Sequence, residues 1–379
     1  MFHNQFRRAA VLAAVSLAAI SLGSCETPAP APAPVIAVAP PPPPPPPPLS
    51  VYPRVIEQAA AFEAYMKRAG GITPLFTDGA SVSRSLTIAA AYEPRQLATG
   101  AIAYGAVAAL QDPVFVESVR AYTRSPTQRA EIAAKIAANP AYVAGFPGAE
   151  NAAGLVAAAL DREGRRVRLA GEGVKQSAYS VQRQAWSKVA IPDREARLAS
   201  IKALGTALPP AETSAIERLR GLAMGTTPGA AAATADVKPP YTPVVIRSLA
   251  IAALSALGYG DDPAFAPSFD TLLVEPTGGS CLNYSKLMLN QCLAVAKPWY
   301  EDVFCLGQHV LIDTGQCMVQ AGNAPPPALA LPVTPVSATP AQGVVSTPLT
   351  SAAVLPGRPA AATGSAPSLQ PRPATSPGS

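Results

Sequence analysis

Four cysteines between residues 281 and 317 constrain the fold of this chain more than any other feature. Cys281, Cys292, Cys305 and Cys317 lie almost symmetrically about Lys297-Pro298. This dipeptide interrupts two segments with helical patterns, 282–296 and 299–312. Because proline disfavours a helical conformation at the residue before it, the first helix is expected to end there. The sequence therefore predicts a helical hairpin with Cys292 and Cys305 close to the break and Cys281 and Cys317 at its outer ends.

The spacing of these cysteines favours one pairing. Cys281 and Cys292 stand on the same predicted helix, about 16 Å apart along its axis. Disulfide-bonded residues have Cα atoms within about 7 Å of each other, so these two cannot pair while the segment stays helical. Nested pairing, Cys281–Cys317 and Cys292–Cys305, would instead staple the hairpin. Four cysteines allow three connectivities, and the sequence leaves the other two open.

The stretch 50–322 carries helical signals nearly throughout. Helix starts recur as a capping residue followed by proline, which occupies a position where no N–H is needed. These pairs are Asp112-Pro113, Ser125-Pro126, Thr242-Pro243 and Asp262-Pro263. The chain is 49% hydrophobic but only 6% aromatic and 14% charged, which favours alanine-rich helix packing. We therefore predict an all-α fold, an alanine-rich helical bundle with a C-terminal disulfide-stapled hairpin.

Composition divides this stretch into three parts. Residues 50–225 are predicted to form an α-helical domain, and residues 243–322 a helical module with the four cysteines. Residues 226–242 are rich in Thr, Ala, Gly and Pro, so a loop is expected between them. Residues 100–110 are apolar and small, which predicts a helix packed closely inside the bundle.

The longest periodic stretch runs from about residue 149 to residue 189, with an apolar face and a basic face. Gly171 and Gly173 weaken its middle, so the sequence predicts two helices with a bend. The basic cluster Arg165-Arg166-Val167-Arg168 suits an anionic polymer or lipid headgroups. The favoured interpretation is a solvated helix face paired with the neighbouring acids Asp161 and Glu163.

The N-terminal segment has the pattern of a secretory signal. Arg7 and Arg8 precede an apolar run, 9–22, which is shorter than the roughly 20 residues that span a bilayer. The tetrapeptide Leu22-Gly23-Ser24-Cys25 resembles the lipobox of bacterial lipoproteins. This resemblance implies that residues 1–24 are a signal peptide and that Cys25 is lipidated and becomes the new N-terminus. Cleavage without lipidation is the alternative.

The same resemblance implies a location in the cell. In lipoproteins of Gram-negative type, Asp after the lipidated cysteine retains the protein in the inner membrane. Glu26 stands there in this chain, which favours a lipid anchor on the periplasmic face of the outer membrane over the inner membrane. Once Cys25 carries lipid, four of the five cysteines remain, an even number that suits two disulfides in an oxidising compartment.

Proline-rich segments flank the helical part. Residues 25–49 hold the unbroken run 40–48 and are predicted to be a linker that extends about 75 Å in the polyproline II conformation. A spacer is favoured over a ligand for a proline-binding module. Residues 323–379 are rich in Pro, Ala, Ser and Thr, with Arg358 and Arg372 as the only charged side chains. Such a segment buries little apolar surface, so we predict a disordered tail.

Few residues suggest catalysis. His309 is the only histidine after the predicted cleavage, and neither Gly-x-Ser-x-Gly nor Ser-x-x-Lys occurs. His309 with Cys305 and Cys317 lacks the paired spacing of zinc modules, so no metal is predicted. Asp313-Thr314-Gly315 matches the aspartic-protease triplet in a single copy, for which chance is the favoured explanation.

One carboxylate is a weak catalytic candidate. Glu117-Ser118 resembles the Glu-Ser pair of lytic transglycosylases, which implies that Glu117 acts as a general acid. The supporting motifs of that family are not recognisable in this chain. Such an acid needs a raised pKa in a cleft, so an exposed glutamate on a helix is the favoured interpretation.

These observations predict a lipid-anchored periplasmic envelope protein of Gram-negative type, a structural or interaction scaffold without catalysis or cofactor. The expected partners are the membrane, through the N-terminal lipid, and peptidoglycan or another envelope protein. The net charge of +5 falls to +3 without the signal, which does not suggest nucleic acid. The alternatives are a cell-wall-acting enzyme similar to lytic transglycosylases and a carrier of a small ligand.

Overall fold

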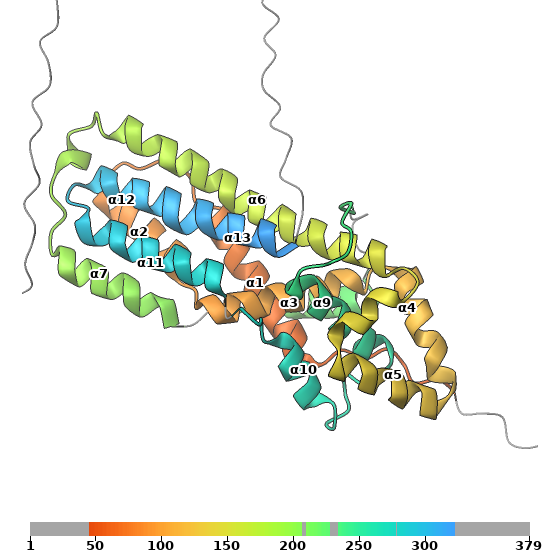
Figure 1. Cartoon of the computed structure of the whole chain (residues 1–379). Coiled ribbons are helices and arrows are strands. Elements are labelled where there is room, and N and C mark those ends of the chain that lie inside the picture. The colour runs from red at the N-terminus through yellow and green to blue at the C-terminus, as the bar shows by residue number, and fades with distance from the viewer. Residues whose placement is uncertain (1–44, 207–209, 228–233, 278, 323–379) are drawn as a thin grey trace, which may run out of the picture. The chain divides into compact units, whose positions relative to one another are not determined.

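The computed structural model describes residues 45–206, 210–227, 234–277 and 279–322 (Figure 1). All of them belong to one compact unit that ends at Pro326. Cys25, most of the predicted linker and the predicted tail 323–379 lie outside the described residues.

Within the described ranges the chain forms thirteen α-helices and no strand. The α-helices are α1 (Pro53–Gly70), α2 (Gly79–Ala90), α3 (Pro94–Ala109), α4 (Pro113–Arg120), α5 (Pro126–Ala138), α6 (Ala149–Val181), α7 (Arg194–Ala203), α8 (Thr213–Ala223), α9 (Pro243–Ala256), α10 (Ala266–Leu273), α11 (Ser280–Val295), α12 (Trp299–Cys305) and α13 (Asp313–Gly322). Short 3-10 helices are η1 (Ala121–Arg124), η2 (Pro140–Gly145), η3 (Trp186–Lys188) and η4 (Leu204–Thr206), and η5 (Leu306–Ile312) is a π-helix. The predicted all-α fold is confirmed.

Capping explains where most of the predicted helices start. Asp112 accepts a hydrogen bond from the backbone nitrogen of Phe115 at 2.6 Å, and Pro113 follows it at the first helical position. Ser125 and Thr242 cap α5 and α9 in the same way. The start predicted at Asp262-Pro263 is wrong, because Asp262 accepts from the backbone nitrogen of Ala264 in a turn. The helix that follows, α10, begins at Ala266.

Helix α6 is continuous through Gly171 and Gly173, so the predicted division into two helices is wrong. A Cβ on Gly171 would lie 2.7 Å from the backbone nitrogen of Ile312 and 2.9 Å from the backbone oxygen of Gly307. Glycine at position 171 therefore lets the backbone of η5 approach α6 closely. The packing gained on this face stabilises a helix that propensity alone would weaken. Figure 1 shows α6 running alongside α12 and α13, which it contacts together with η5.

The centre of the fold is α3, which packs against α1, α6 and α9. Its small side chains are buried nearly all round, as predicted for residues 100–110. One hydrophobic core runs from α1 through α9 to α13, so residues on both sides of the segment 226–242 share it. The described part of this segment forms neither helix nor strand. Among the described helices, none is long and apolar enough to cross a membrane.

The last residues of the predicted linker are attached to the bundle. Arg120 donates to the backbone oxygen of Pro47 at 3.2 Å, and the backbone nitrogen of Ser50 donates to the backbone oxygen of Ser255 at 3.1 Å. The chain therefore enters the bundle beside α4 and the C-terminal end of α9.

Candidate functional site

The four cysteines form the nested pair of disulfides. Cys281 bonds to Cys317 and Cys292 bonds to Cys305, with a Cα–Cα distance of 5.7 Å in each pair. The outer disulfide joins α11 to α13 and the inner one joins α11 to α12. The predicted pairing is confirmed, and it leaves Cys305 and Cys317 without thiols for a metal at His309.

The neighbours of His309 are structural contacts. Its Nδ1 atom lies 3.1 Å from Oδ2 of Asp313, one helical turn later. Thr314 and Gly315 lie in the interior, and Gly315 packs against the backbone of α6. The part of the chain that the structure describes contains no group of three or more His, Cys, Asp or Glu side chains that could hold a metal ion.

Three buried hydroxyls link the segment after α2 to α11 and α13. The Tyr92 hydroxyl lies 3.3 Å from Ser285 Oγ and 3.2 Å from Thr314 Oγ1, and Ser285 donates to the backbone oxygen of His309. Since η5 departs from α-helical hydrogen bonding, this bond gives a carbonyl of the π-helix a buried partner. Sequence reasoning missed the cluster, because its members lie on three segments and carry no motif.

A buried ion pair fastens α7 to the hairpin. Arg197 bonds to Asp302, whose side chain is fully buried, and also to the backbone oxygen of Leu293. Burial raises the pKa of Asp302 to about 6, although the nearby Arg197 guanidinium acts in the opposite direction. Arg194, one turn earlier, donates to the backbone oxygens of Ala294 and Ala296.

Glu117 lies exposed on α4 and lines none of the three hollows described below. The neighbouring Ser118 hydroxyl donates to the backbone oxygens of Phe115 and Pro147, at 2.8 Å and 2.9 Å. Ser118 therefore ties α4 to the turn before α6, and its hydroxyl does not hydrogen-bond to the Glu117 side chain. This arrangement agrees with the interpretation of Glu117 as an exposed glutamate on a helix.

The basic cluster on α6 is paired with acids, as predicted, but the expected solvated face is wrong, because its three arginines are half-buried. Arg165 bonds to Asp161, Arg166 to Glu163, and Arg168 lies 3.3 Å from Glu172. The Glu163 side chain is only 4% exposed, and burial raises its pKa against the influence of the Arg166 guanidinium. The pairing leaves this stretch less suited to an anionic polymer than its sequence suggests.

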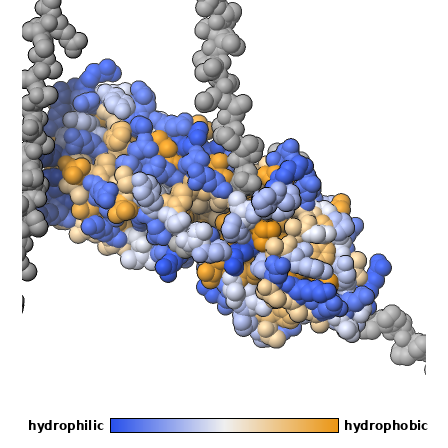
Figure 2. Space-filling view, viewed as in Figure 1, coloured by the Kyte–Doolittle hydropathy of each residue, from blue (hydrophilic) through white to orange (hydrophobic). Residues whose placement is uncertain are grey.

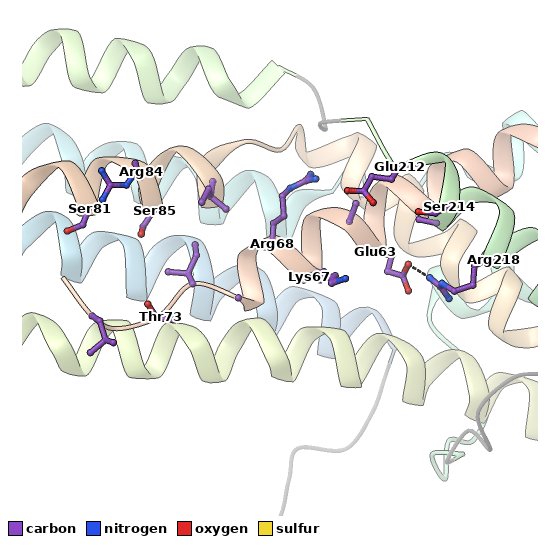
Figure 3. Close-up of a pocket in the computed structure, with 16 residues that line it drawn as sticks. Glu63, Lys67, Arg68, Thr73, Ser81, Arg84, Ser85, Glu212, Ser214 and Arg218 are labelled. Carbon is purple, nitrogen blue, oxygen red and sulfur yellow. Dashed lines mark hydrogen bonds and ion pairs between the residues drawn. The ribbon is translucent and has the colours of Figure 1, made fainter. Parts of the chain in front are cut away.

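A groove with unpaired cations lies elsewhere, between α1, α2 and α8 (Figure 3). Its volume is about 820 Å³, and the loop after α1 closes one side. Four cations line it, with Lys67 and Arg68 on α1, Arg84 on α2 and Arg218 on α8. We call this hollow the α1–α2–α8 groove.

The groove carries a surplus of positive charge. Arg218 is neutralised by Glu63, which Figure 3 shows as an ion pair on one wall. Lys67 and Arg68 form no ion pair with any described residue. Glu212 is the second acid of the lining, so four cations face two carboxylates. The groove therefore attracts anions.

Hydroxyls and aliphatic groups complete the lining. Thr73, Ser85 and Ser214 contribute hydroxyls that make no hydrogen bond to another described residue. Leu75 is 80% exposed and Ile88 is 40% exposed, although both are aliphatic. Sequence reasoning missed this groove, because its residues come from separate helices and each helix shows only an ordinary polar face.

Two smaller hollows lie beside the disulfides. One, of about 300 Å³, is lined mainly by apolar residues of α6, α11 and α12, among them Tyr179 and Phe304. The other, of about 210 Å³, lies next to Cys281 and Cys317. On the face seen in Figure 2, hydrophobic residues are interspersed with hydrophilic ones.

The chain was compared with protein families, curated proteins and solved structures. No family model, no curated protein and no solved structure matches it.

Proposed function

We propose that this protein is a lipid-anchored envelope protein of Gram-negative type, held on the periplasmic face of the outer membrane. Its helical body acts as a binding scaffold and not as an enzyme. The observation that carries this proposal is the nested pair of disulfides, Cys281–Cys317 and Cys292–Cys305.

The disulfides support a location outside the cytosol. Such bonds form and persist in secreted and periplasmic proteins and are rare in the cytosol. They account for four of the five cysteines, and the fifth is Cys25 in the lipobox-like tetrapeptide. The proline-rich residues that follow Cys25 lead to the bundle at Pro47, where the chain is fastened to Arg120.

The α1–α2–α8 groove supports a binding role. Its unpaired cations and hydroxyls suit recognition of an anionic partner, and peptidoglycan and other envelope proteins both carry carboxylates. Glu117 is exposed on a separate helix, so no specific contact favours it as a general acid. Binding, rather than wall cleavage, is therefore the role that we assign.

A fractionation experiment tests the anchor. Cys25→Ser should move the protein from the membrane fraction to the soluble periplasm and abolish incorporation of labelled palmitate. The paired variant Cys281→Ser/Cys317→Ser, which removes a disulfide and keeps Cys25, should stay in the membrane fraction. Continued membrane association of the Cys25→Ser protein would overturn the proposal.

A second experiment tests the scaffold role. Crosslinking in intact cells, followed by identification of the attached molecules, should recover peptidoglycan fragments or one recurrent envelope protein. Recovery of neither would contradict a scaffold in the envelope.

A further inference from the structure

We propose that this protein forms a symmetric homodimer in which the outer face of α11 packs antiparallel against the same face of a second copy. This face consists of Tyr284, Leu287, Met288, Gln291 and Val295, and we call it the α11 stripe. The inference goes beyond the proposed binding role, and it depends neither on the lipid anchor nor on the α1–α2–α8 groove.

The composition of α11 is the first argument. Its core face holds the buried residues Leu282, Leu289 and Leu293, and its opposite face holds the α11 stripe. The only charged residue of the helix, Lys286, turns away from the stripe and donates to the backbone oxygen of Ala90 at 2.6 Å. A helix with apolar side chains on opposite faces and almost no charge is typical of a buried position. Another surface is therefore expected to cover the outer face of α11.

The α11 stripe is exposed along the whole length of the helix. Tyr284, Leu287 and Val295 are each more than half exposed. Positions 284, 288, 291 and 295 are spaced by four, three and four residues, so they form one row about 16 Å long. The helices α7 and α12 contact α11 from its two sides and leave this row at the surface of the described residues (Figure 1).

A hollow at one end of the stripe offers a place for an aromatic ring. This hollow of about 300 Å³ lies between α6, α11 and α12, and we call it the α12 hollow. Its lining includes Val295 of the stripe and the aromatic residues Tyr179, Tyr300 and Phe304. Aromatic rings pair favourably with other rings, and the exposed amide of Gln182 in the same lining suits a tyrosine hydroxyl. The α12 hollow therefore suits a tyrosine side chain.

The α11 stripe carries a tyrosine at its other end. Tyr284 and Val295 are eleven residues apart, which is about 16 Å along the helix axis. In an antiparallel pair of α11 helices, Tyr284 of each copy lies opposite Val295 of the other, beside its α12 hollow. Leu287 and Met288 meet near the two-fold axis. One axis therefore fills both hollows at once, as an isologous interface requires, and a second copy is the occupant that matches ring to hollow.

Charge also favours a second copy. A two-fold axis brings each charged side chain near it close to its own duplicate, and like charges that face each other destabilise an interface. The α11 stripe contains no charged side chain. An interface built from it is stabilised by apolar burial and is therefore expected to persist at high salt.

Analytical ultracentrifugation of the full mature chain tests this proposal. Every protein in the test carries Cys25→Ser, so that neither a lipid nor a disulfide through Cys25 joins two copies. Sedimentation velocity over a range of protein concentrations should show a reversible equilibrium between monomer and dimer. The dimer dissociation constant should change less than about twofold between 0.1 M and 1 M salt, because no charge pair holds the interface.

Matched variants locate the interface. Tyr284→Asp and Leu287→Asp should each raise the dimer dissociation constant at least about tenfold, because the two-fold axis places each new charge in the apolar interface twice. Val114→Asp and Leu75→Asp make the same kind of change at exposed apolar positions outside the stripe, and they should leave the dissociation constant unchanged. Circular dichroism verifies that each variant is folded.

A photo-crosslink reports where the side chain at position 284 lies in the dimer. Isotopically heavy chains with p-benzoylphenylalanine in place of Tyr284 are mixed with light chains and irradiated. They should attach to light peptides of the α12 hollow that contain Tyr179 or Phe304. The same amino acid in place of Val114 should give no crosslink between heavy and light chains.

The outcomes separate a homodimer from other uses of this face. A concentration-dependent dimer that both α11 variants weaken and that crosslinks into the α12 hollow supports the proposal. It is overturned if the chain stays monomeric at its highest soluble concentration, if Val114→Asp weakens the dimer as much as Tyr284→Asp does, or if the crosslink attaches outside the hollow. It is also overturned if the crosslink from position 284 in intact cells reaches only a different protein. The Cys25→Ser fractionation does not depend on dimerisation, so the proposed location and the proposed dimer fail separately.

Discussion

Gly171 on α6 lies against the backbone of Ile312, where an added Cβ would stand 2.7 Å from the nitrogen atom. Seven residues earlier on the same helix, Gly164 lies against Gly315, with an added Cβ 2.6 Å from its backbone oxygen. The two glycines face η5 and α13 in turn. They hold α6 against the last elements of the bundle at backbone distance.

A first prediction follows from this contact. Gly171→Ala should lower the free energy of unfolding by about 1–3 kcal/mol, because the methyl group overpacks a contact between two backbones. Gly173→Ala is the matched control, since a Cβ added at Gly173 would lie 3.8 Å from the nearest atom, Cγ of Pro74. It should raise stability by about 0.5–1 kcal/mol through helix propensity. Urea unfolding of both variants measures the difference, and equal effects would contradict the close-approach explanation.

A second prediction concerns the disulfides. Non-reducing peptide mapping should recover Cys281 with Cys317 and Cys292 with Cys305. The loops they close have sequence separations of 36 and 13 residues. In the chain-entropy model, replacing both cysteines of a pair with serine should cost about 4 kcal/mol for the outer bond and about 3 kcal/mol for the inner one. A larger loss for the inner pair would contradict this ordering.

A third prediction uses the raised pKa of Asp302, about 6 in the folded protein against an ordinary value of 3.8. The folded state then binds this proton more tightly than the unfolded state. The contribution of Asp302 to stability is therefore highest below about pH 4 and declines as the pH rises through 6. The decline should amount to roughly 2–3 kcal/mol.

Urea unfolding between pH 4 and pH 7 measures this contribution. The stability difference between the wild type and Asp302→Asn should shrink, or change sign against the wild type, as the pH rises. Asp270→Asn is the control, because Asp270 pairs with Arg54 at the surface. A difference between the wild type and Asp302→Asn that stays constant across this range would show that the pKa is not raised.

A fourth prediction addresses the alternative of a cell-wall-acting enzyme. Purified protein and its Glu117→Gln variant should both leave peptidoglycan uncleaved, because Glu117 is an exposed side chain outside the described hollows. The same substitution should change the free energy of unfolding by less than about 0.5 kcal/mol. Release of muropeptides by the wild type and not by the variant would restore the enzymatic alternative.

The sequence predicted those features that depend on local spacing. The cysteine intervals favoured the nested pairing, because a helix keeps Cys281 and Cys292 too far apart to bond, although the other two connectivities stayed open. The capping pairs at Asp112, Ser125 and Thr242 marked helix starts, because capping requires only neighbouring residues. Asp262-Pro263 shows the limit, since the same residue types also stabilise a turn.

Features that depend on tertiary contacts were not predicted. Glycine weakens an isolated helix and permits close packing of two helices, and only the position of η5 shows which effect prevails at Gly171. Arg197 and Asp302 are separated by 105 residues, so no local sequence pattern predicts their ion pair. The α1–α2–α8 groove likewise forms from polar faces that are unremarkable until the helices meet.

The nested disulfides also determine what proteolysis can do to this chain. Any single cut between Cys281 and Cys317 leaves the two fragments joined, because the outer bond spans the whole interval. A nicked molecule would keep its mass on a non-reducing gel and separate into two pieces only after reduction. A protease that cuts the connection near Lys297 would therefore leave the residues after Cys317 covalently attached to the rest of the protein.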